Sequence, residues 1–211
     1  MDAGLVELRV LGCLIEQQRT TPDAYPLSLN ALRLACNQAT NRDPVVEYDE
    51  PTIRHALDSL TRRGWARLAS GPGSRAVKFR HLFDEALGLD AAEISLLSVL
   101  MLRGPQTAGE LKQRSERLHQ FADREEIEHV LSALAERELV VRLPRRAGQK
   151  EERWEQLFGS ETPAASMPAE GGALSSPGDD GDDRLVALER AVADLREEVV
   201  ALRAELEQLR T

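Results

Sequence analysis

The sequence predicts a mainly α fold with small β-hairpins (α+β), and three patterns support that class. Apolar residues recur at a spacing of three to four in several segments, which is the period of an amphipathic helix. Two pairs of short alternating segments flank turns, as the strands of a hairpin do. This succession of helices and hairpin occurs twice, and an unbroken apolar repeat closes the chain. Together the patterns predict tandem winged helix-turn-helix domains plus a C-terminal coiled-coil helix.

These patterns divide the chain into four expected segments. Residues 1–83 are predicted to form winged-helix domain 1, and residues 84–158 winged-helix domain 2. Residues 159–183 shift to Gly, Pro, Ser, Ala and acidic residues without an apolar period, which predicts a flexible linker. Residues 184–211 carry the closing repeat and are predicted to form the coiled-coil helix.

Domain 1 is expected to begin with a helix that ends before Thr20, because apolar residues lie at helical spacing between Leu5 and Ile15. A loop with two prolines follows, and Tyr25 is its expected anchor. Ser28 can cap the next helix, since a serine oxygen accepts a free first-turn amide. That helix is predicted to bury Leu32, Ala35, Cys36 and Ala39 and to end near Thr40.

The second helix of the helix-turn-helix is expected to begin near Pro51, whose fixed φ suits a first turn, and to stop at Gly64. Ile53, Leu57 and Leu60 give it a buried side. Residues 65–68 and 76–80 then flank a Gly/Pro turn, which predicts the hairpin that forms the wing.

Each half of the chain also contains longer motifs of its own. The first half contains Thr20-Thr21-Pro22-Asp23, Tyr25-Pro26-Leu27-Ser28-Leu29-Asn30-Ala31-Leu32, Ala35-Cys36-Asn37-Gln38 and Asn41-Arg42-Asp43-Pro44-Val45. The second contains Leu102-Arg103-Gly104-Pro105-Gln106-Thr107, Gly109-Glu110-Leu111, Leu143-Pro144-Arg145 and Gly148-Gln149-Lys150-Glu151. These motifs closely resemble the bacterial YceH family over residues 5–158, which implies a pair of winged-helix domains and little about activity. The chain departs from that family at Trp154, where Tyr is usual, and in its extension from Gly159.

The residues independently indicate a duplication. The set Ile53, Leu57 and Leu60 aligns with Ile127, Leu131 and Leu134 at a constant offset of 74 residues. Three pairs in the second copy have capping-box spacing and therefore mark three helix starts: Asp90 with Glu93, Thr107 with Glu110, and Asp123 with Glu126. The cores expected for these helices are Ile94, Leu97, Leu100 and Met101, then Leu111, then Ile127, Leu131 and Leu134. Residues 139–143 and 153–157 supply the second pair of wing strands.

The closing repeat defines a heptad register. Its a and d positions are Leu185, Leu188, Val192, Leu195, Val199, Leu202, Leu206 and Leu209. Valine at a with leucine at d favours a parallel dimer, and the g-to-e′ pairs are never like-charged in that arrangement. We therefore predict dimerisation through these residues. The alternative is an amphipathic helix that folds back onto the winged helices through the linker.

Net charge is −9, but its distribution is uneven. Residues 1–82 sum to +2, residues 83–158 to −4 and residues 159–211 to −7. Because a protein that coats nucleic acid is expected to be basic overall, DNA contact is predicted to be local and confined mostly to the first third.

Several other classes are disfavoured. Cys13 and Cys36 lie in apolar helical patterns, which predicts two buried thiols in a reducing cytosol. No signal peptide or run of 18 apolar residues is present, so the expected location is cytoplasmic and no membrane partner is predicted. The four histidines never form a spaced ligand pair, and no phosphate loop or nucleophile motif occurs. We therefore predict no catalytic residue, metal or cofactor, and a protein that is not an enzyme.

The predicted DNA-binding surface combines the second helix of domain 1 with its wing, since cations on both sides of a groove suit phosphate contact. Its residues are Arg54, His55, Arg62, Arg63, Arg67, Arg75, Lys78 and Arg80. The alternative for the arginines is a solvated, ion-paired face. The amides of Asn30, Asn37, Gln38 and Asn41 are expected to serve the local backbone rather than to read bases.

The corresponding helix of domain 2 is acidic, with Glu125, Glu126, Glu128 and Glu136, and is expected to repel a duplex. This domain is therefore predicted to bind protein or to support dimerisation. The expected function is a DNA-binding winged-helix protein, a transcriptional regulator that acts as a homodimer. The alternative is a non-enzymatic protein-interaction scaffold that uses both winged helices, similar to the segregation protein ScpB.

Overall fold

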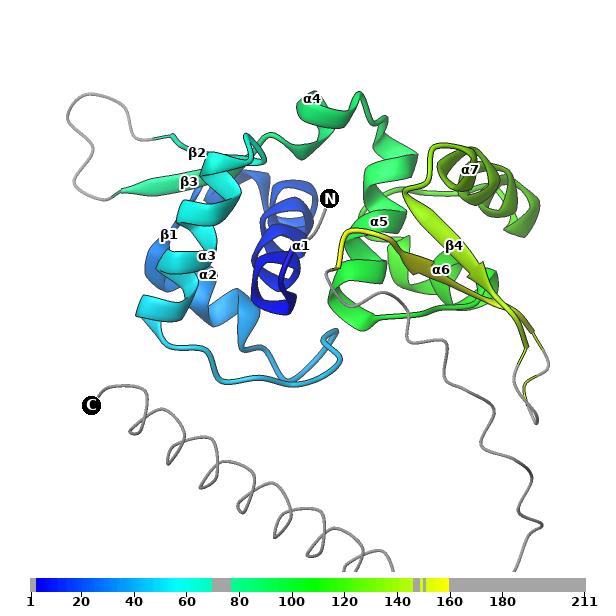
Figure 1. Ribbon diagram of the computed structural model, residues 1–211, viewed down its shortest axis with the longest axis horizontal. Helices are drawn as coiled ribbons and strands as arrows, with labels where there is room; N and C mark the ends of the chain where they lie inside the picture. The colour runs from blue at the N-terminus through cyan, green and yellow to red at the C-terminus, as the bar shows by residue number, and fades with distance from the viewer. Residues whose placement is uncertain (1–2, 70–76, 146–148, 150, 160–211) are drawn as a thin grey trace, which may run out of the picture. The chain divides into compact units, whose positions relative to one another are not determined.

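The structure is a computed structural model that describes residues 3–69, 77–145, 149 and 151–159. Within these ranges the fold is α+β, with seven α-helices, one 3₁₀ turn and two small antiparallel sheets (Figure 1). The N-terminal part comprises α1 (Leu5–Thr20), η1 (Pro22–Ala24), β1 (Leu27–Ser28), α2 (Leu29–Cys36), α3 (Glu50–Arg62), β2 (Ala66–Leu68) and β3 (Lys78–His81). The following part comprises α4 (Phe83–Leu87), α5 (Ala91–Arg103), α6 (Ala108–Ser115), α7 (Arg124–Glu136), β4 (Val140–Leu143) and β5 (Arg153–Gln156).

The first sheet has three strands in the order β1-β3-β2. The predicted hairpin is confirmed, because Leu68 pairs with Phe79 and Ala66 with His81. The sequence did not predict β1, whose two residues are too few to show an alternating pattern. Leu27 pairs with Phe79 on the other side of β3. Tyr25 anchors this corner as predicted, since its hydroxyl accepts a hydrogen bond from the His81 amide at 2.8 Å.

The prediction that the helix capped by Ser28 continues to near Thr40 is wrong. Ser28 caps α2 as expected, accepting from the Ala31 amide, but the helix ends at Cys36 and Ala39 is exposed. The physical reason is Asn37. Its side chain accepts from the Tyr48 amide at 2.9 Å and donates to the Tyr48 carbonyl at 2.8 Å, which ties the chain after α2 to the residues before α3.

Most of the predicted helix boundaries are confirmed, at the starts of the helices and at the C-terminal end of α3. Asp49 caps α3 with Pro51 in its first turn, and Gly64 follows the helix at a φ of 73°, a conformation that favours glycine. Complete capping boxes start α5 at Asp90 and α6 at Thr107. At α7 only half of the predicted box forms, because the Glu126 carboxylate accepts from Ala122 rather than from the Asp123 amide.

One continuous core runs through the described residues, and α1 and α5 pack against each other at its centre. All residues predicted as second-copy core are buried. The two helices approach closely at Gly12, whose carbonyl accepts a hydrogen bond from the Ser98 hydroxyl at 3.1 Å. Phe83 and Phe158 meet edge to face with ring centroids 5.1 Å apart. The N-terminus joins the same region, since the Ala3 amide donates to the Phe158 carbonyl at 2.6 Å.

Several predictions lie outside the described residues. They are the wing turn that contains Arg75, the linker after Gly159 and the whole coiled-coil segment 184–211. The linker and the coiled-coil helix stay predictions from sequence.

Candidate nucleic-acid interface

The exposed side of α3 carries most of the predicted site. Its buried side is Ile53, Ala56, Leu57 and Leu60, as the apolar spacing predicts. Arg54, His55 and Arg62 therefore fall on the exposed side. Neither Arg54 nor Arg62 forms an ion pair or hydrogen bond within the described part of the chain, so two full positive charges face solvent.

The outward face of the β2–β3 hairpin adds further cations. Side chains alternate along β3, with Phe79 and His81 turned into the core and Lys78 and Arg80 on the opposite face. Arg67 on β2 lies directly opposite Arg80 in the antiparallel register. Like charges in that position are destabilising, by up to about 1 kcal/mol. Arg80 offsets this by pairing with Glu85, whereas Arg67 has no partner among the described residues.

The other predicted residues have neighbours that reduce their availability. The Arg63 guanidinium lies 3.8 Å from a Glu7 carboxylate oxygen and 5.5 Å from the centroid of the Trp65 ring. His55 lines an open cavity with Leu5 and Pro51, between the first turns of α1 and α3. It is therefore set toward α1 rather than toward the hairpin.

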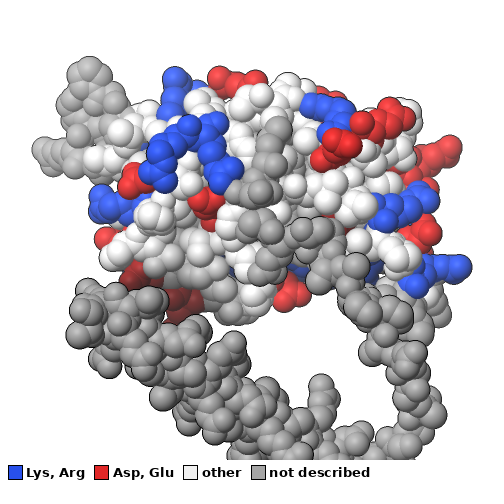
Figure 2. Space-filling view, in the orientation of Figure 1, with Lys and Arg blue, Asp and Glu red and all other residues white. Residues whose placement is uncertain are grey.

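Figure 2 shows where the cations gather in space. Lys and Arg atoms form a group over the C-terminal end of α3 beside the β2–β3 hairpin, with isolated acidic atoms among them. The residues that contribute charge without an acidic partner in the described chain are Arg54, Arg62 and Arg67. The structure thus brings the helix and hairpin arginines onto neighbouring elements, because β2 follows α3 after a single tight turn at Gly64.

The second half has a different electrostatic arrangement. Four of its arginines are paired with carboxylates: Arg124 with Glu128 and Glu151, both at 2.8 Å, Arg137 with Glu93 at 2.9 Å, Arg142 with Glu152 at 3.2 Å and Arg153 with Glu110 at 3.0 Å. Helix α7, the counterpart of α3, leaves Glu125 and Glu136 exposed. The arginines within α7, β4 and β5 are therefore neutralised, whereas Arg54 and Arg62 of α3 have no acidic partner in the described chain.

Of the four amide side chains predicted to serve the local backbone, only Asn37 bonds to backbone groups within the described residues, and its partner is eleven residues away. Asn37 bridges to Tyr48, and the Asn30 oxygen accepts from Arg33 at 3.2 Å. Asn41 adopts a positive φ of 60° and accepts from Arg103 of α5, which joins the two halves. Gln38 lines a polar cavity beside Asn41 and Arg103.

Buried ionisable groups lie elsewhere in the core. Cys13 and Cys36 are free and buried, as predicted. The contact with the Cys13 thiol and burial raise the pKa of Cys36, which keeps that thiol protonated. Arg42 is enclosed and pairs with Glu16 at 2.5 Å, while its Nε donates to the Ala35 carbonyl at 3.1 Å. Within the described ranges, His, Cys, Asp and Glu never gather in a group of three that can hold a metal ion.

Comparison with known proteins places the chain in a family. The family model described as "Protein of unknown function, DUF480" matches residues 4–149. The chain belongs to the DUF480 family. This confirms the resemblance to an uncharacterised bacterial family that the motifs of the two halves predict.

Relatives of the DUF480 chain match over nearly their full lengths. A UPF0502 protein of Pelobacter propionicus is 50% identical over 203 residues, which cover 93% of this chain and 91% of the relative. UPF0502 proteins of Pseudomonas putida and Pectobacterium carotovorum are 47% and 44% identical. The Pseudomonas putida match covers 87% of this chain and 86% of the relative. The Pectobacterium carotovorum match covers 94% of this chain and 96% of the relative. Among the described helices, none has the length and apolar character needed to span a bilayer.

Proposed function

We propose that this DUF480 protein is a cytoplasmic, homodimeric DNA-binding protein built from two winged helices, and that it acts as a transcriptional regulator. Each half supplies three helices followed by a hairpin: α1, α2, α3 with β2–β3, and α5, α6, α7 with β4–β5. That order is the one a winged helix-turn-helix requires, with α3 as the recognition helix and β2–β3 as the wing.

The observation that carries the proposal is the unpaired positive charge on α3 and β2. Arg54, Arg62 and Arg67 have no acidic partner in the described chain, whereas carboxylates neutralise Arg124, Arg137, Arg142 and Arg153 of the second half. Cations left without partners on a helix and an adjacent hairpin suit contact with phosphates on both sides of a groove. The opposed Arg67 and Arg80 fit the same role, because a bound polyanion would relieve their mutual repulsion.

Dimerisation through residues 184–211 is part of the proposal. Tethering two weak sites raises the local concentration of the second to about the millimolar range, so that a modest single contact suffices. The second half would then have another role, since the acidic exposed residues of α7 are suited to a protein partner rather than to a duplex.

The test is fluorescence anisotropy of a labelled mixed-sequence DNA duplex titrated with the full chain. We expect the affinity to fall steeply between 50 and 200 mM salt, and the double variant Arg54→Glu/Arg62→Glu to weaken binding at least about tenfold and to flatten the salt slope. Arg124→Glu/Arg142→Glu is the control for altered net charge, because it changes the charge by the same amount at exposed arginines outside the proposed surface. DNA affinity that is insensitive to salt, or an equal loss of DNA affinity in Arg54→Glu/Arg62→Glu and in the control, would refute the DNA-binding proposal.

A second candidate is a protein-interaction scaffold that uses both winged helices, and the acidic exposed residues of α7 favour it. Charge reversal at Arg62 and Arg63 separates the two functions. Loss of DNA binding in this variant supports the regulator hypothesis. Unchanged DNA binding together with loss of binding to a protein partner supports the scaffold hypothesis.

A further inference from the structure

A polar cavity lies between the two halves of the described chain, apart from the α3 surface. Its volume is about 670 Å³, within the range of small-molecule sites. α1 and the segment after α2 supply one wall, and α5, α6 and the turn after α6 supply the other. A ligand there would touch both halves at once.

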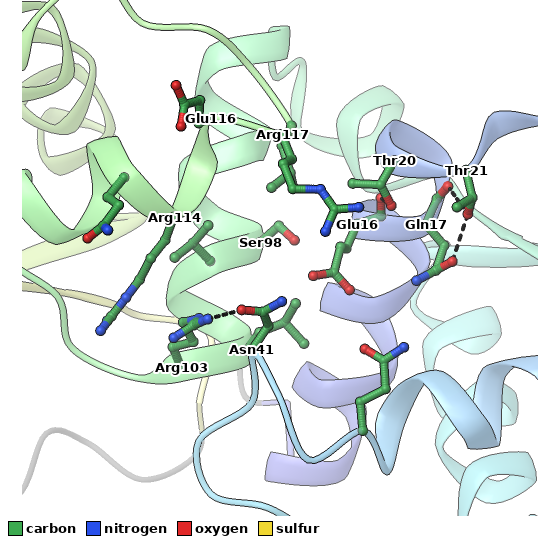
Figure 3. A pocket seen from close by; sticks show the side chains of 15 residues that line it. Glu16, Gln17, Thr20, Thr21, Asn41, Ser98, Arg103, Arg114, Glu116 and Arg117 are labelled. Carbon is green, nitrogen blue, oxygen red and sulfur yellow. Dashed lines mark hydrogen bonds between the residues drawn. The ribbon is translucent and has the colours of Figure 1, made fainter.

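Three arginines approach this cavity from the second half. Arg103 is the last residue of α5, Arg114 lies in α6, and Arg117 follows α6. Figure 3 shows Arg103 and Arg114 near each other at one side, whereas Arg117 reaches toward Glu16 and Thr20 of α1. The site therefore presents positive charge at two separate places.

The carboxylates near the cavity leave much of this charge uncompensated. Glu16 is engaged by Arg42, with 2.5 Å between nitrogen and oxygen. Glu110 lies 3.7 Å from Arg114 but is shared with Arg153, which is closer at 3.0 Å. Figure 3 shows the carboxylate of Glu116 turned away from Arg117.

Arg117 itself forms no ion pair or hydrogen bond within the described residues. Arg103 donates only to the neutral oxygen of Asn41. Burial, and then the charges of Arg114 and Arg42, lower the pKa of the Arg103 guanidinium, so cations are crowded on this side of the cavity. An anion is the ligand that relieves such crowding.

Neutral polar groups complete the lining. The amide side chains of Gln38 and Gln113 face the cavity without a hydrogen-bond partner in the described chain. They are suited to the uncharged polar part of an organic molecule, because each offers both donors and an acceptor.

We propose that this cavity, which we call the inter-half pocket, binds a small organic anion bearing phosphate or carboxylate groups. Arg103 and Arg114 hold one anionic group, and Arg117, at a separate place on the same wall, holds a second group or stabilises the first. Guanidinium groups favour both anions because their paired N–H donors match two oxygens at once. The site is independent of the proposed DNA contact, since it shares no residue with it.

The test is isothermal titration of the full chain with inorganic phosphate, pyrophosphate, citrate and adenosine monophosphate, each at constant ionic strength. We expect saturable binding of at least one probe and a loss of affinity of at least tenfold in Arg117→Ala, which removes an exposed side chain that forms no ion pair or hydrogen bond within the described residues. Arg54→Ala is the matched control, because Arg54 is an exposed, unpaired arginine outside the pocket.

Distinct outcomes separate this proposal from the DNA-binding one. Retained anion binding in Arg54→Ala, with impaired DNA binding, supports two separate sites. Absence of saturable binding by all four probes, or equal affinity in Arg117→Ala and the unmodified chain, would overturn the pocket assignment. Competition by duplex DNA that is lost in Arg117→Ala, without binding of any small probe, would assign these arginines to a nucleic-acid surface instead.

Discussion

His81 illustrates how burial sets the protonation of a single residue. Its ring is fully enclosed, Nε2–H donates to the Gln18 Oε1 atom at 2.5 Å, and Nδ1 accepts from the Phe83 amide at 3.4 Å. Burial lowers the pKa of His81 to about 4, although the nearby Asp84 carboxylate opposes this shift. The folded chain therefore holds a neutral imidazole that connects β3 to α1.

This arrangement predicts a pH-dependent stability. The pKa of His81 is lower in the folded chain, at about 4, than the ordinary 6.5, so the unfolded chain binds more protons between these values. Stability from the neutral ring is fully present above pH 6.5 and is lost as pH falls toward 4. Between pH 7 and pH 5 the free energy of unfolding should drop by about 2 kcal/mol from this group.

Urea denaturation at pH 7, 6 and 5 measures the effect. His81→Gln should show a smaller pH dependence, whereas His129→Gln, at an exposed site on α7, should behave like the unmodified chain. Identical pH dependence in all three chains would contradict the assignment.

At the scale of elements, the crossing of α1 and α5 depends on Gly12. A Cβ atom at that position would lie 2.9 Å from Leu102 Cγ and Cδ2 and 3.3 Å from Met101 Cβ. Glycine normally destabilises a helix interior by about 1 kcal/mol relative to alanine. Here its missing side chain permits the close approach that the Ser98 hydrogen bond also requires.

Gly12→Ala should therefore lower the free energy of unfolding by about 1–3 kcal/mol despite the better helix propensity of alanine. Gly109→Ala in α6 is the control, because its only neighbour within 4 Å would be the Thr107 oxygen at 3.9 Å. That substitution should be neutral or stabilising by up to about 1 kcal/mol. Thermal or urea denaturation measures the change in the free energy of unfolding for both variants. A change of the same sign in both would show that packing at Gly12 does not limit stability.

At the scale of the whole molecule, two similar halves differ in surface charge. In the first half three arginines on α3 and β2 have no acidic partner in the described chain, and in the second half carboxylates pair with Arg124, Arg137, Arg142 and Arg153. Function would then be divided between the halves even though both have the same order of helices and strands. The inter-half pocket lies where a bound anion can affect both.

The proposed homodimer makes a prediction at this scale. Sedimentation equilibrium of the full chain should give twice the chain mass, whereas a version ending at Ala165, which retains the first compact unit, should give a single chain mass. The double variant Leu195→Lys/Leu202→Lys should also be monomeric, because lysine at two d positions disrupts an apolar seam. Equal masses for the full and shortened chains would exclude the coiled coil as the dimer contact.

The sequence by itself determined the local features of this protein. Helix starts near Pro51 and at Asp90 and Thr107 could be predicted because the signals for a helix start lie within one turn, and buried positions because apolar spacing defines a face. The exposed arginines of α3 could be predicted for the same reason. The charge difference between the halves is also visible in composition.

Only the tertiary structure decided the features that depend on residues far apart in the chain. The end of α2 depends on the bonds between Asn37 and Tyr48, and β1 is defined only by its pairing with β3. Which arginines are neutralised depends on partners such as Glu151 for Arg124. The inter-half pocket is lined by four separate segments, so no local pattern reveals it. Spacing along the chain fixes which face of a helix is apolar, but close packing of α1 against α5 decides which distant side chains meet.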